Sequence, residues 1–585
     1  MSESIHASTT LRLRHALQRL WVNLKIKRRR QILLVAMLMI LSSIAEMFSL
    51  GAVVPFLAVL AEPDKVWVTR EVQSLAPFLG WQQPTDLVLP LCFVFAAAAA
   101  FNGIVRLLAL RGTIALANGI GSDLSIEVYR RTLYQPYAVH LQRNSSEAIS
   151  AIASRVDQVV GMVSGILQML TAGLVSLGLA CLLLFLSPFV TLSMALVLGG
   201  GYLLAMAYSR RRLQRLGPEI MKNQTQLIRS LQEGLGAIRD VILAGNQPVY
   251  TTIYGQADRR LRQQRGLAQF LAFAPRYGME AVGLIAIAMT ALRLVAGPTS
   301  VLGALPLLGA LALGAQRLLP SLQLIYLSWN NCRVNIPALS SILCYLEQPI
   351  DQADLLAVPA APLRLEREIL LKGVGFRYAK EASWVFRELD LRIGRGERIG
   401  IVGKTGSGKS TLIDLLMGLL EPTSGRVLVD GLALEGERLR AWRSTVAHVP
   451  QSIFLADASI AENIAFGVKK GQLDLQRLEQ AIEQAQIANF ISSLPNGYHT
   501  EVGERGVRLS GGQRQRIGIA RALYKQAAVL VMDEATSALD EATEAQVMNA
   551  INKMSPDLTI LMIAHRLSTL EKCDSIFNVG NAEHL

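Results

Sequence analysis

The stretch GKTGSGKS, residues 403–410, decides the fold class of the second half of this chain. It fits the pattern G-x-x-x-x-G-K-[ST], whose glycines let backbone N–H groups turn inward around phosphates. Residues 398–402 read as a buried strand entering this loop, and residues 411–420 as a helix whose N-terminus faces the phosphates. A chance glycine-rich turn requires neither flanking element, so the context favours a nucleotide site. The predicted contacts are Gly403, Thr405, Gly406, Ser407, Gly408, Lys409, Ser410 and Thr411.

Two carboxylates follow a second buried strand. The apolar run 528–532 ends in Asp533 and Glu534, as expected of a parallel strand that delivers side chains to the carboxyl edge of a sheet. Asp533 is predicted to hold Mg²⁺ through water, and Glu534 to orient or deprotonate the attacking water. A merely solvated pair at a strand end is the alternative. With the phosphate loop upstream, the combination predicts ATP hydrolysis.

Further segments resemble one family, the ATP-binding-cassette (ABC) transporters. LSGGQ at residues 509–513 stands as that family's signature sequence, and SALD at residues 537–540 follows the acidic pair as its D-loop does. The resemblance implies that Ser510 and Gly512 contact the γ-phosphate of a nucleotide bound by the phosphate loop of a second subunit. The nucleotide contacts it implies in these two segments are Ser510, Gly511, Gly512, Gln513 and Asp540.

The same resemblance assigns three more residues. Tyr378 matches the aromatic that stacks on adenine, Gln451 matches the Q-loop, and His565 matches the switch histidine that touches the γ-phosphate. Tyr378 as a core aromatic and His565 as a satisfied strand-end histidine remain open alternatives. The predicted catalytic residues are Glu534, His565 and Gln451, and the predicted Mg²⁺ ligands are Ser410, Gln451 and Asp533.

Composition points to a protein partly embedded in lipid. Of 585 residues, 51% are hydrophobic and the mean hydropathy is +0.35, too apolar for an ordinary soluble enzyme. The five cysteines are scattered without C-x-x-C spacing, which suggests neither a disulfide framework nor a zinc site. A net charge of +13 is concentrated beside apolar segments, for example at residues 25–30 and 210–215. The positive-inside rule explains this placement, so no nucleic-acid partner is expected.

Six apolar stretches precede the phosphate loop, each long enough to span a bilayer, for which about 20 residues suffice. They are approximately residues 31–61, 87–110, 159–186, 189–208, 270–294 and 301–327. The basic cluster before the first predicts a cytoplasmic N-terminus, and the run after it is too long for a cleaved signal. The polar connections 111–158 and 209–269 are predicted as cytoplasmic extensions of membrane helices. Breaks near residues 135–144 and 245–248 resemble the family's short helices that touch the ATPase domain; ordinary loops are the alternative.

The predicted fold class is a six-helix α-helical transmembrane domain fused to a cytoplasmic α/β P-loop ATP-binding-cassette domain. The expected boundaries are a transmembrane domain at 1–350, a linker at 351–363 containing VPAAP, and the cassette at 364–585. One phosphate loop and one signature segment per chain predict a homodimer. The chain is therefore expected to be a multi-pass inner (cytoplasmic) membrane protein, surrounded by membrane lipids, that resembles exporter-type half-transporters.

Three arginines inside apolar stretches are the best indication of cargo: Arg106, Arg276 and Arg317. An arginine at the bilayer centre costs about 2.5–3.5 kcal/mol on insertion scales, so such residues face a cavity, a partner charge or an interface. Helix rise from the outer ends of their helices places Arg106 and Arg317 towards the inner leaflet, and Arg276 lies just inside the cytoplasmic start of its helix. One hypothesis is that they bind an anionic phosphate or diphosphate headgroup. The alternatives are snorkelling and internal pairing, for which Glu280 and Glu46 offer carboxylates.

A narrower resemblance favours the cargo hypothesis. AEMF with VPF in the first apolar stretch, APRYGME at residues 274–280 and QRLLP at residues 316–320 look like the bacterial subgroup that flips lipid-linked oligosaccharides or exports polysaccharide precursors. This resemblance implies an anionic, diphosphate-linked glycolipid as substrate. A broad-range lipid or multidrug exporter is the alternative, and a membrane-anchored ATP-dependent switch without transport is an alternative of another class.

Overall fold

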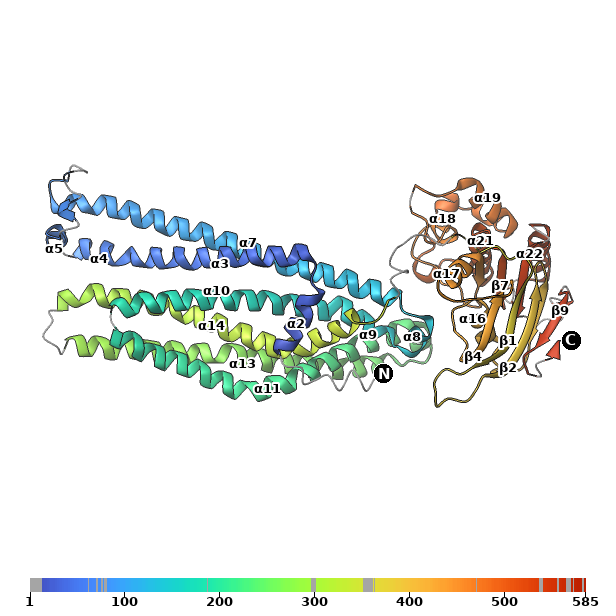
Figure 1. Cartoon of the computed structure of the whole chain (residues 1–585), viewed down its shortest axis with the longest axis horizontal. Coiled ribbons are helices and arrows are strands. Elements are labelled where there is room, and N and C mark those ends of the chain that lie inside the picture. The colour runs from blue at the N-terminus through green and yellow to red at the C-terminus, as the bar shows by residue number, and fades with distance from the viewer. Residues whose placement is uncertain are drawn as a thin grey trace. The chain divides into compact units, whose positions relative to one another are not determined.

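The structure is a computed structural model. It describes residues 13–61, 63–69, 72–74, 77, 81–186, 188–295, 301–350, 361, 363–469, 471–535, 540–554, 557–563, 570–571, 573–580 and 583–584. Contacts group the chain into two compact units (Figure 1). The first comprises Met1–Gln135 with Arg143–Ile350, and the second comprises Pro136–Gln142 with Asp351–Leu585.

Long helices build the first unit, and those at the predicted spans confirm its membrane-type architecture. In the described part of the chain the elements are α2 (Leu13–Asn23), α3 (Ile26–Gly51), α4 (Val53–Ala61), α5 (Pro63–Trp67), η1 (Pro84–Leu87), α7 (Val88–Leu133), α9 (Ser145–Ser150), η2 (Ala151–Arg155), α10 (Val156–Leu186), α11 (Pro188–Gly236), α12 (Ile238–Leu243), α13 (Gln247–Val295) and α14 (Val301–Leu346). The first span contains a break at Ala52, between α3 and α4. Figure 1 shows the long helices running side by side.

Three helices that carry the predicted cytoplasmic extensions are much longer than a bilayer requires. α7, α11 and α13 contain 46, 49 and 49 residues, against about 20 for a span. Their polar halves continue the apolar halves without interruption, as the sequence predicted. Among the described residues, the helices long and apolar enough to cross a membrane are Ile26–Ser49, Pro84–Leu133 and Ser145–Leu182.

Short helices lie at the two predicted breaks. α8 (Tyr137–Gln142) falls inside the first break and belongs to the second compact unit. α12 lies immediately before the second break, because Gly245, with φ of 63°, turns the chain after α12 ends. The sequence signals therefore located the end of this short helix and not its body.

The bundle is held by an apolar core and by ion pairs between distant segments. Buried residues of α2, α3, α7, α10 and α14 form one cluster, in which Leu339 and Ile342 are completely buried. Lys25 and Arg28 pair with Asp123 at 2.9 and 2.7 Å, joining α3 to α7. Because α3 and α7 run antiparallel in Figure 1, this contact helps to fix which residues of the two helices face each other.

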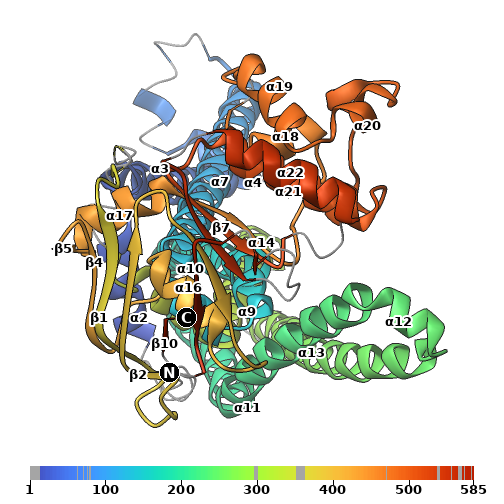
Figure 2. The ribbon, with the colours of Figure 1, turned by 90° about the vertical axis from the view of Figure 1, so that its right-hand side faces the viewer.

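The second unit combines two sheets with helices (Figure 2). In its described residues, a four-stranded sheet has the order β2-β1-β4-β5 and a six-stranded sheet the order β10-β9-β3-β8-β7-β6. The strands are β1 (Glu368–Phe376), β2 (Phe386–Gly394), β3 (Arg398–Val402), β4 (Ser424–Val429), β5 (Leu432–Ala433), β6 (Val446–Val449), β7 (Val529–Asp533), β8 (Thr559–Ile563), β9 (Ser575–Asn578) and β10 (Glu583–His584). Strands β6, β7, β8, β3 and β9 run parallel, and their carboxyl ends therefore meet at one edge.

The helices of this unit complete two apolar cores. They are α16 (Lys409–Leu416), α17 (Gly436–Thr445), α18 (Ile460–Ile464), α19 (Leu475–Gln484), α20 (Ala488–Ser492), α21 (Gly511–Tyr524) and α22 (Glu541–Met554). One core includes β1, β2, β3 and α16 around the fully buried Trp442, whose indole N–H donates to the Leu416 carbonyl at 2.7 Å. The other joins α18, α19, α21 and α22 to β6, β7 and β8. Both predicted strands, at 398–402 and 528–532, are confirmed within one residue.

Candidate functional site

The phosphate loop connects β3 to α16, as predicted, although the helix begins at Lys409 and ends at Leu416. Gly403, Gly406 and Gly408 have φ of 153°, 81° and 99°, a region that favours glycine. A Cβ at Gly408 would lie 2.7 Å from the Phe386 ring, so the loop backbone also approaches its neighbours too closely for a side chain. The sequence folds into an open loop here because glycine alone meets both conditions.

The polar groups of the loop form a cradle. Lys409 Nζ donates to the carbonyls of Gly403 and Lys404 at 2.8 and 3.2 Å, which folds the ammonium over the loop. The Ser407 hydroxyl is buried and has no hydrogen-bond partner among the described residues. A buried polar atom without a partner is costly, and a phosphate oxygen would satisfy it. The cradle therefore fits the phosphates of a nucleotide.

Tyr378 lies beside this cradle. Its hydroxyl is 2.8 Å from the Thr411 hydroxyl at the start of α16, and its ring packs edge-on against Phe376 at 5.0 Å. Tyr378 is nevertheless 44% exposed, which leaves ring surface outside the core. An adenine stacked on this surface would place its phosphates next to α16.

Helix α8 also reaches this region. Gln142 Nε2 donates to the Tyr378 carbonyl at 3.3 Å, and Ala138 packs against the apolar core around α16. Burial, and then the nearby Asp414 and Tyr378, raise the pKa of Tyr137. The sequence indicated that a short helix here touches the ATPase domain, and it did not indicate that the contact lies beside Tyr378.

The predicted catalytic residue Glu534 is held by one contact to its carboxylate and one to its backbone. Gln451 Nε2 donates to Glu534 Oε2 at 2.6 Å, so the structure brings the Q-loop residue and the predicted base together. The Glu534 N–H donates to the Ile563 carbonyl at 3.1 Å, and Glu534 adopts a φ of 49°, a backbone conformation uncommon for a non-glycine residue. Asp533 is the last residue of β7, and the chain turns directly after it.

One acidic residue near this edge was not predicted. Burial, and then the charge of Asp533, raise the pKa of Asp414 to about 6. Asp414 lies one helical turn beyond Ser410 on α16, and this i, i+4 spacing was the signal that could have revealed it. The parallel edge therefore carries more negative charge than the sequence motifs alone suggest.

The signature segment forms the start of α21. Ser510 and Gln513 make a capping box, in which the Ser510 hydroxyl accepts from the Gln513 N–H at 3.2 Å and Gln513 Oε1 accepts from the Ser510 N–H at 2.8 Å. Gly511 and Gly512 occupy the first helical positions, where backbone N–H groups lack acceptors within the helix. The segment thus presents the positive end of a helix, which attracts phosphate.

Asp540 has a different role in the described structure. Its carboxylate accepts from the Thr543 N–H at 2.9 Å and from the Thr543 hydroxyl at 2.7 Å, which caps the start of α22. The Thr543 N–H and hydroxyl lower the pKa of Asp540. His565 and residues 537–539 lie outside the described residues.

The predicted cargo arginines have carboxylate partners where the structure describes them. Arg106 Nη1 lies 3.2 Å from Glu46 Oε2, and Arg276 Nε donates to Glu280 Oε1 at 2.7 Å. These are the internal pairs that the alternative interpretation anticipated. The side chain of Arg317, on α14, lies outside the described residues.

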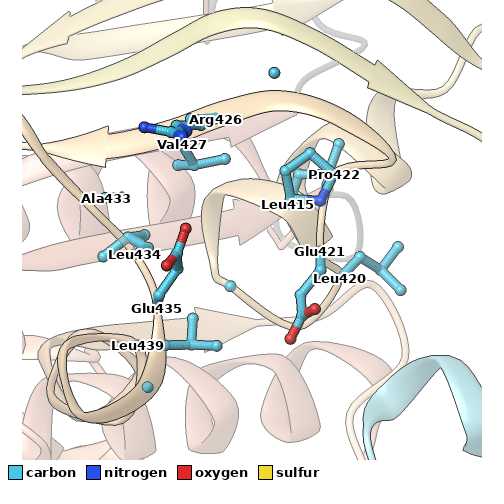
Figure 3. A pocket seen from close by; sticks show the side chains of 13 residues that line it. Leu415, Leu420, Glu421, Pro422, Arg426, Val427, Ala433, Leu434, Glu435 and Leu439 are labelled. Atoms are coloured by element: carbon cyan, nitrogen blue, oxygen red, sulfur yellow. The ribbon is translucent and has the colours of Figure 1, made fainter.

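The cassette contains a separate cavity of about 390 Å³ between β4, α16 and α17. Figure 3 shows Glu421 and Glu435 on opposite sides of it, and Arg426 on β4 is the cation among its lining residues. Two carboxylates and one guanidinium give this cavity a negative formal charge, which is unfavourable for phosphates. The cradle at residues 403–410 is therefore the better nucleotide site.

Comparisons with known proteins extend over most of the chain. Residues 386–537 match the family "ABC transporter", and residues 31–297 match "ABC transporter transmembrane region". The ATP-dependent lipid A-core flippase of Chromohalobacter salexigens is 32% identical over 507 residues, which cover 85% of each chain. The protein of the same name from Xanthomonas campestris pv. campestris is 34% identical over 469 residues, 79% of this chain and 77% of its own.

One solved structure gives an independent comparison of the fold. It is described as a bacterial Atm1-family ABC exporter with ATP bound, and it has a TM-score of 0.75 while covering 94% of each chain. Its sequence identity of 23% is low, so the similarity concerns the fold alone.

Proposed function

Since this chain belongs to the ABC transporter family, as a multi-pass half-transporter that binds ATP and couples its hydrolysis to export, we propose that it flips a lipid-linked substrate from the inner to the outer leaflet. The half-transporter architecture implies dimerisation, and we propose that the second subunit is another copy of this chain. We further propose a cytoplasmic (inner) membrane location with the cassette in the cytoplasm, based on the basic cluster at residues 25–30. The substrate class is a diphosphate-linked glycolipid.

In the proposed hydrolysis, Glu534 accepts the proton of the attacking water while Gln451 holds the carboxylate in position. Ser410, Gln451 and Asp533 supply a hydroxyl, an amide oxygen and a carboxylate, the hard oxygen donors that Mg²⁺ prefers. When bound, Mg²⁺ would neutralise charge that develops on the phosphates. Lys409 would leave the loop carbonyls for the β- and γ-phosphates, and His565 would contact the γ-phosphate as the resemblance implies.

Two helix ends complete each nucleotide site in the proposed dimer. The start of α16 binds the phosphates in one copy, and the start of α21, at Ser510, faces the same nucleotide from the other copy.

The short helices α8 and α12 would transmit the closure of the cassettes to the membrane helices. α8 already packs beside Tyr378, whereas α12 exposes apolar side chains, with Leu243 75% exposed. We propose that α12 docks on the cassette of the second copy.

Arg106, Arg276 and Arg317 remain the proposed contacts for the anionic headgroup. Arg106 supports this role most directly, since it lines a cavity, and its exposed guanidinium can bind two phosphate oxygens. Arg276 is half exposed, and its guanidinium keeps N–H donors beyond the one that binds Glu280, so it can also contact a phosphate.

The observation that carries the proposal is the similarity, over most of the chain, to relatives named as ATP-dependent flippases of lipid A-core. The test is reconstitution of the purified chain in liposomes with fluorescent glycolipid, phospholipid or drug candidates, with Lys409→Ala as the control that cannot use ATP. We expect ATP-dependent movement of the glycolipid alone. Equal movement of phospholipid or drug would favour a broad-range exporter. Sustained hydrolysis without movement of any candidate would favour a membrane-anchored switch.

A further inference from the structure

A polar cavity of about 390 Å³ lies among α3, α7, α10 and α14, inside the helical unit. Aliphatic side chains of α10 and α14 form part of its wall. The polar lining residues are Ser42, Glu46, Arg106, Thr171, Gln316 and Ser321. Apolar helices that gather one carboxylate, one guanidinium, three hydroxyls and an amide around one space require an explanation beyond packing.

The two charged residues of this cavity are unequally exposed. The Glu46 side chain is 3% exposed, whereas the Arg106 side chain is 59% exposed, and their closest atoms are 3.2 Å apart. The carboxylate is therefore fixed in the wall, and most of the guanidinium surface remains accessible. Arg106 can gain a second anionic partner without first leaving the protein interior.

The depth of the pair excludes snorkelling to the cytoplasmic edge as its whole explanation. On the same two helices, Arg28 of the basic cluster pairs with Asp123. Glu46 lies 18 residues beyond Arg28 on α3, which corresponds to roughly 27 Å of helix. Arg106, which pairs with Glu46, therefore lies far from the cytoplasmic end of these helices marked by Arg28. It lies deeper in the membrane than the helix rise counted from the outer end of α7 indicates.

We infer that this cavity recognises a phosphate that carries neighbouring hydroxyl groups, as in the glycosyl phosphate end of a glycolipid, and that Glu46 determines this specificity. The inference deepens the proposed function and rests on it. Arg106 takes the phosphate oxygens with its planar fork. Glu46 then accepts hydrogen bonds from the sugar hydroxyls in place of Arg106. A bare phosphate brings no donor to Glu46, and the two anions repel each other.

The neutral lining favours a sugar over an ammonium group. Ser42, Gln316 and Ser321 offer hydroxyl and amide groups that can donate or accept, as a polyol requires. Thr171 also lines the cavity, and because its hydroxyl donates to the Leu167 carbonyl at 3.0 Å, its oxygen can serve as an acceptor for a sugar hydroxyl. Among the described lining residues there is no aromatic ring and no second carboxylate, the groups that would select a quaternary or primary amine.

The test compares two lipids that differ in the sugar, whose absence also leaves one more ionisable oxygen on the terminal phosphate. The whole chain is reconstituted in phosphatidylcholine vesicles that contain either isoprenyl diphosphate bearing N-acetylglucosamine or the same isoprenyl diphosphate without the sugar. Lipid-stimulated ATP hydrolysis and flipping are measured against the mole fraction of lipid. The unaltered chain should respond to the sugar-bearing lipid at a mole fraction lower by on the order of tenfold, the discrimination expected from hydrogen bonds to a charged group.

Glu46→Gln retains the shape of the side chain and removes its charge. This variant should bring the ratio of the mole fractions at which the two lipids act, the preference, close to one, mainly by improving the response to the sugar-free lipid. Ser42→Ala is a milder change, to be used if Glu46→Gln folds poorly. It should weaken the response to the sugar-bearing lipid and leave the response to the sugar-free lipid unchanged. Glu233→Gln is the control, since it breaks the 2.7 Å pair with Arg229 outside the cavity, and it should leave the preference unchanged.

Three outcomes decide between the inference and the proposed function. If the unaltered chain moves both lipids equally, the flippase function stands and the specificity role of Glu46 is wrong. If both Glu46→Gln and Ser42→Ala fold, hydrolyse ATP and keep the full preference, the inference is likewise overturned. If neither lipid is moved or stimulates hydrolysis, the proposed substrate class itself fails and the inference fails with it.

Discussion

The cassette and the helical bundle organise their charged residues in opposite ways. In the cassette, the phosphate loop and the signature segment each consist of a few adjacent residues, and the conformation of their backbone forms the site, as at Gly408 and Ser510. In the bundle, the ion pairs that connect two different helices join residues far apart in the chain: Arg106 bonds to Glu46 across 60 positions and Arg28 to Asp123 across 95. Backbone sites can therefore be recognised in sequence, whereas ion-pair sites depend on which helices meet and in what register.

The largest loss of activity is expected if each cassette site needs residues of two chains. Ser510→Arg should reduce ATP hydrolysis to background, because bulk and positive charge would then oppose the nucleotide held by the other copy, while Lys409 is untouched. Hydrolysis is measured on purified, reconstituted protein.

Mixing Ser510→Arg with Lys409→Ala supplies the control for that prediction. A mixed dimer contains one site with both defects and one intact site, so the mixture should be more active than either parent. A fully active monomer would contradict shared sites.

Glu534→Gln should lower the turnover of ATP by about 10²-fold or more while nucleotide binding persists, since the amide keeps the shape of the side chain and removes the base. Turnover and binding of a fluorescent nucleotide are measured on the same sample. Glu479→Gln, an exposed carboxylate on α19, is the matched control. A rate near that of the unaltered chain would remove Glu534 from the role of base.

On the bundle side, Asp123→Asn should lower the free energy of unfolding by about 1–2 kcal/mol, because Lys25 and Arg28 lose a charged acceptor that is only 19% exposed. Chemical denaturation of the protein in detergent checks this value. Arg28→Ala in the Asp123→Asn background should add little, as expected of residues that share one interaction. Equal, additive losses would mean that the pair does not fix the register.

A smaller change, in stability, is expected at Asp414 in the cassette. Because the folded pKa of Asp414 is raised to about 6 from 3.8, ionisation of Asp414 costs stability progressively as the pH rises between these values. Asp414→Asn should therefore raise the free energy of unfolding near pH 7 by about 1 kcal/mol after allowance for solvent screening, and have no effect near pH 4.

Asp540→Asn provides a reference of opposite sign. The pKa of Asp540 is lowered, so this variant should lose stability near neutral pH and not in acid. Unfolding curves at the two pH values, measured for both variants, check the pair of predictions. A pH-independent effect of Asp414→Asn would show that burial of Asp414 does not oppose its charge.

The elements that sequence predicted well are those defined by local patterns. β3 and β7 were found from short apolar runs next to Gly403 and Asp533, and the long helices from hydropathy and the rarity of proline. The predicted position of α12 was displaced. Gly245 and Pro248 mark where one helix stops and the next restarts, and they give no sign of where α12 begins. Glu46 was recognised as a partner for charge, but its depth became visible only when α3 and α7 were paired. Asp414 was missed because the two causes of its raised pKa, burial first and then the charge of Asp533 more than 100 residues away along the chain, both depend on the tertiary fold.

The seven residues Pro136–Gln142 belong by contact to the cassette although the chain places them between two membrane helices. Protein engineers who exchange cassettes between transporters cut such chains at the linker, here near residues 351–363. A cut there would leave Ala138 and Gln142 behind, facing a foreign surface in place of the apolar core and the Tyr378 carbonyl. A compatible exchange must therefore carry two separate pieces of the gene, one of them only seven codons long.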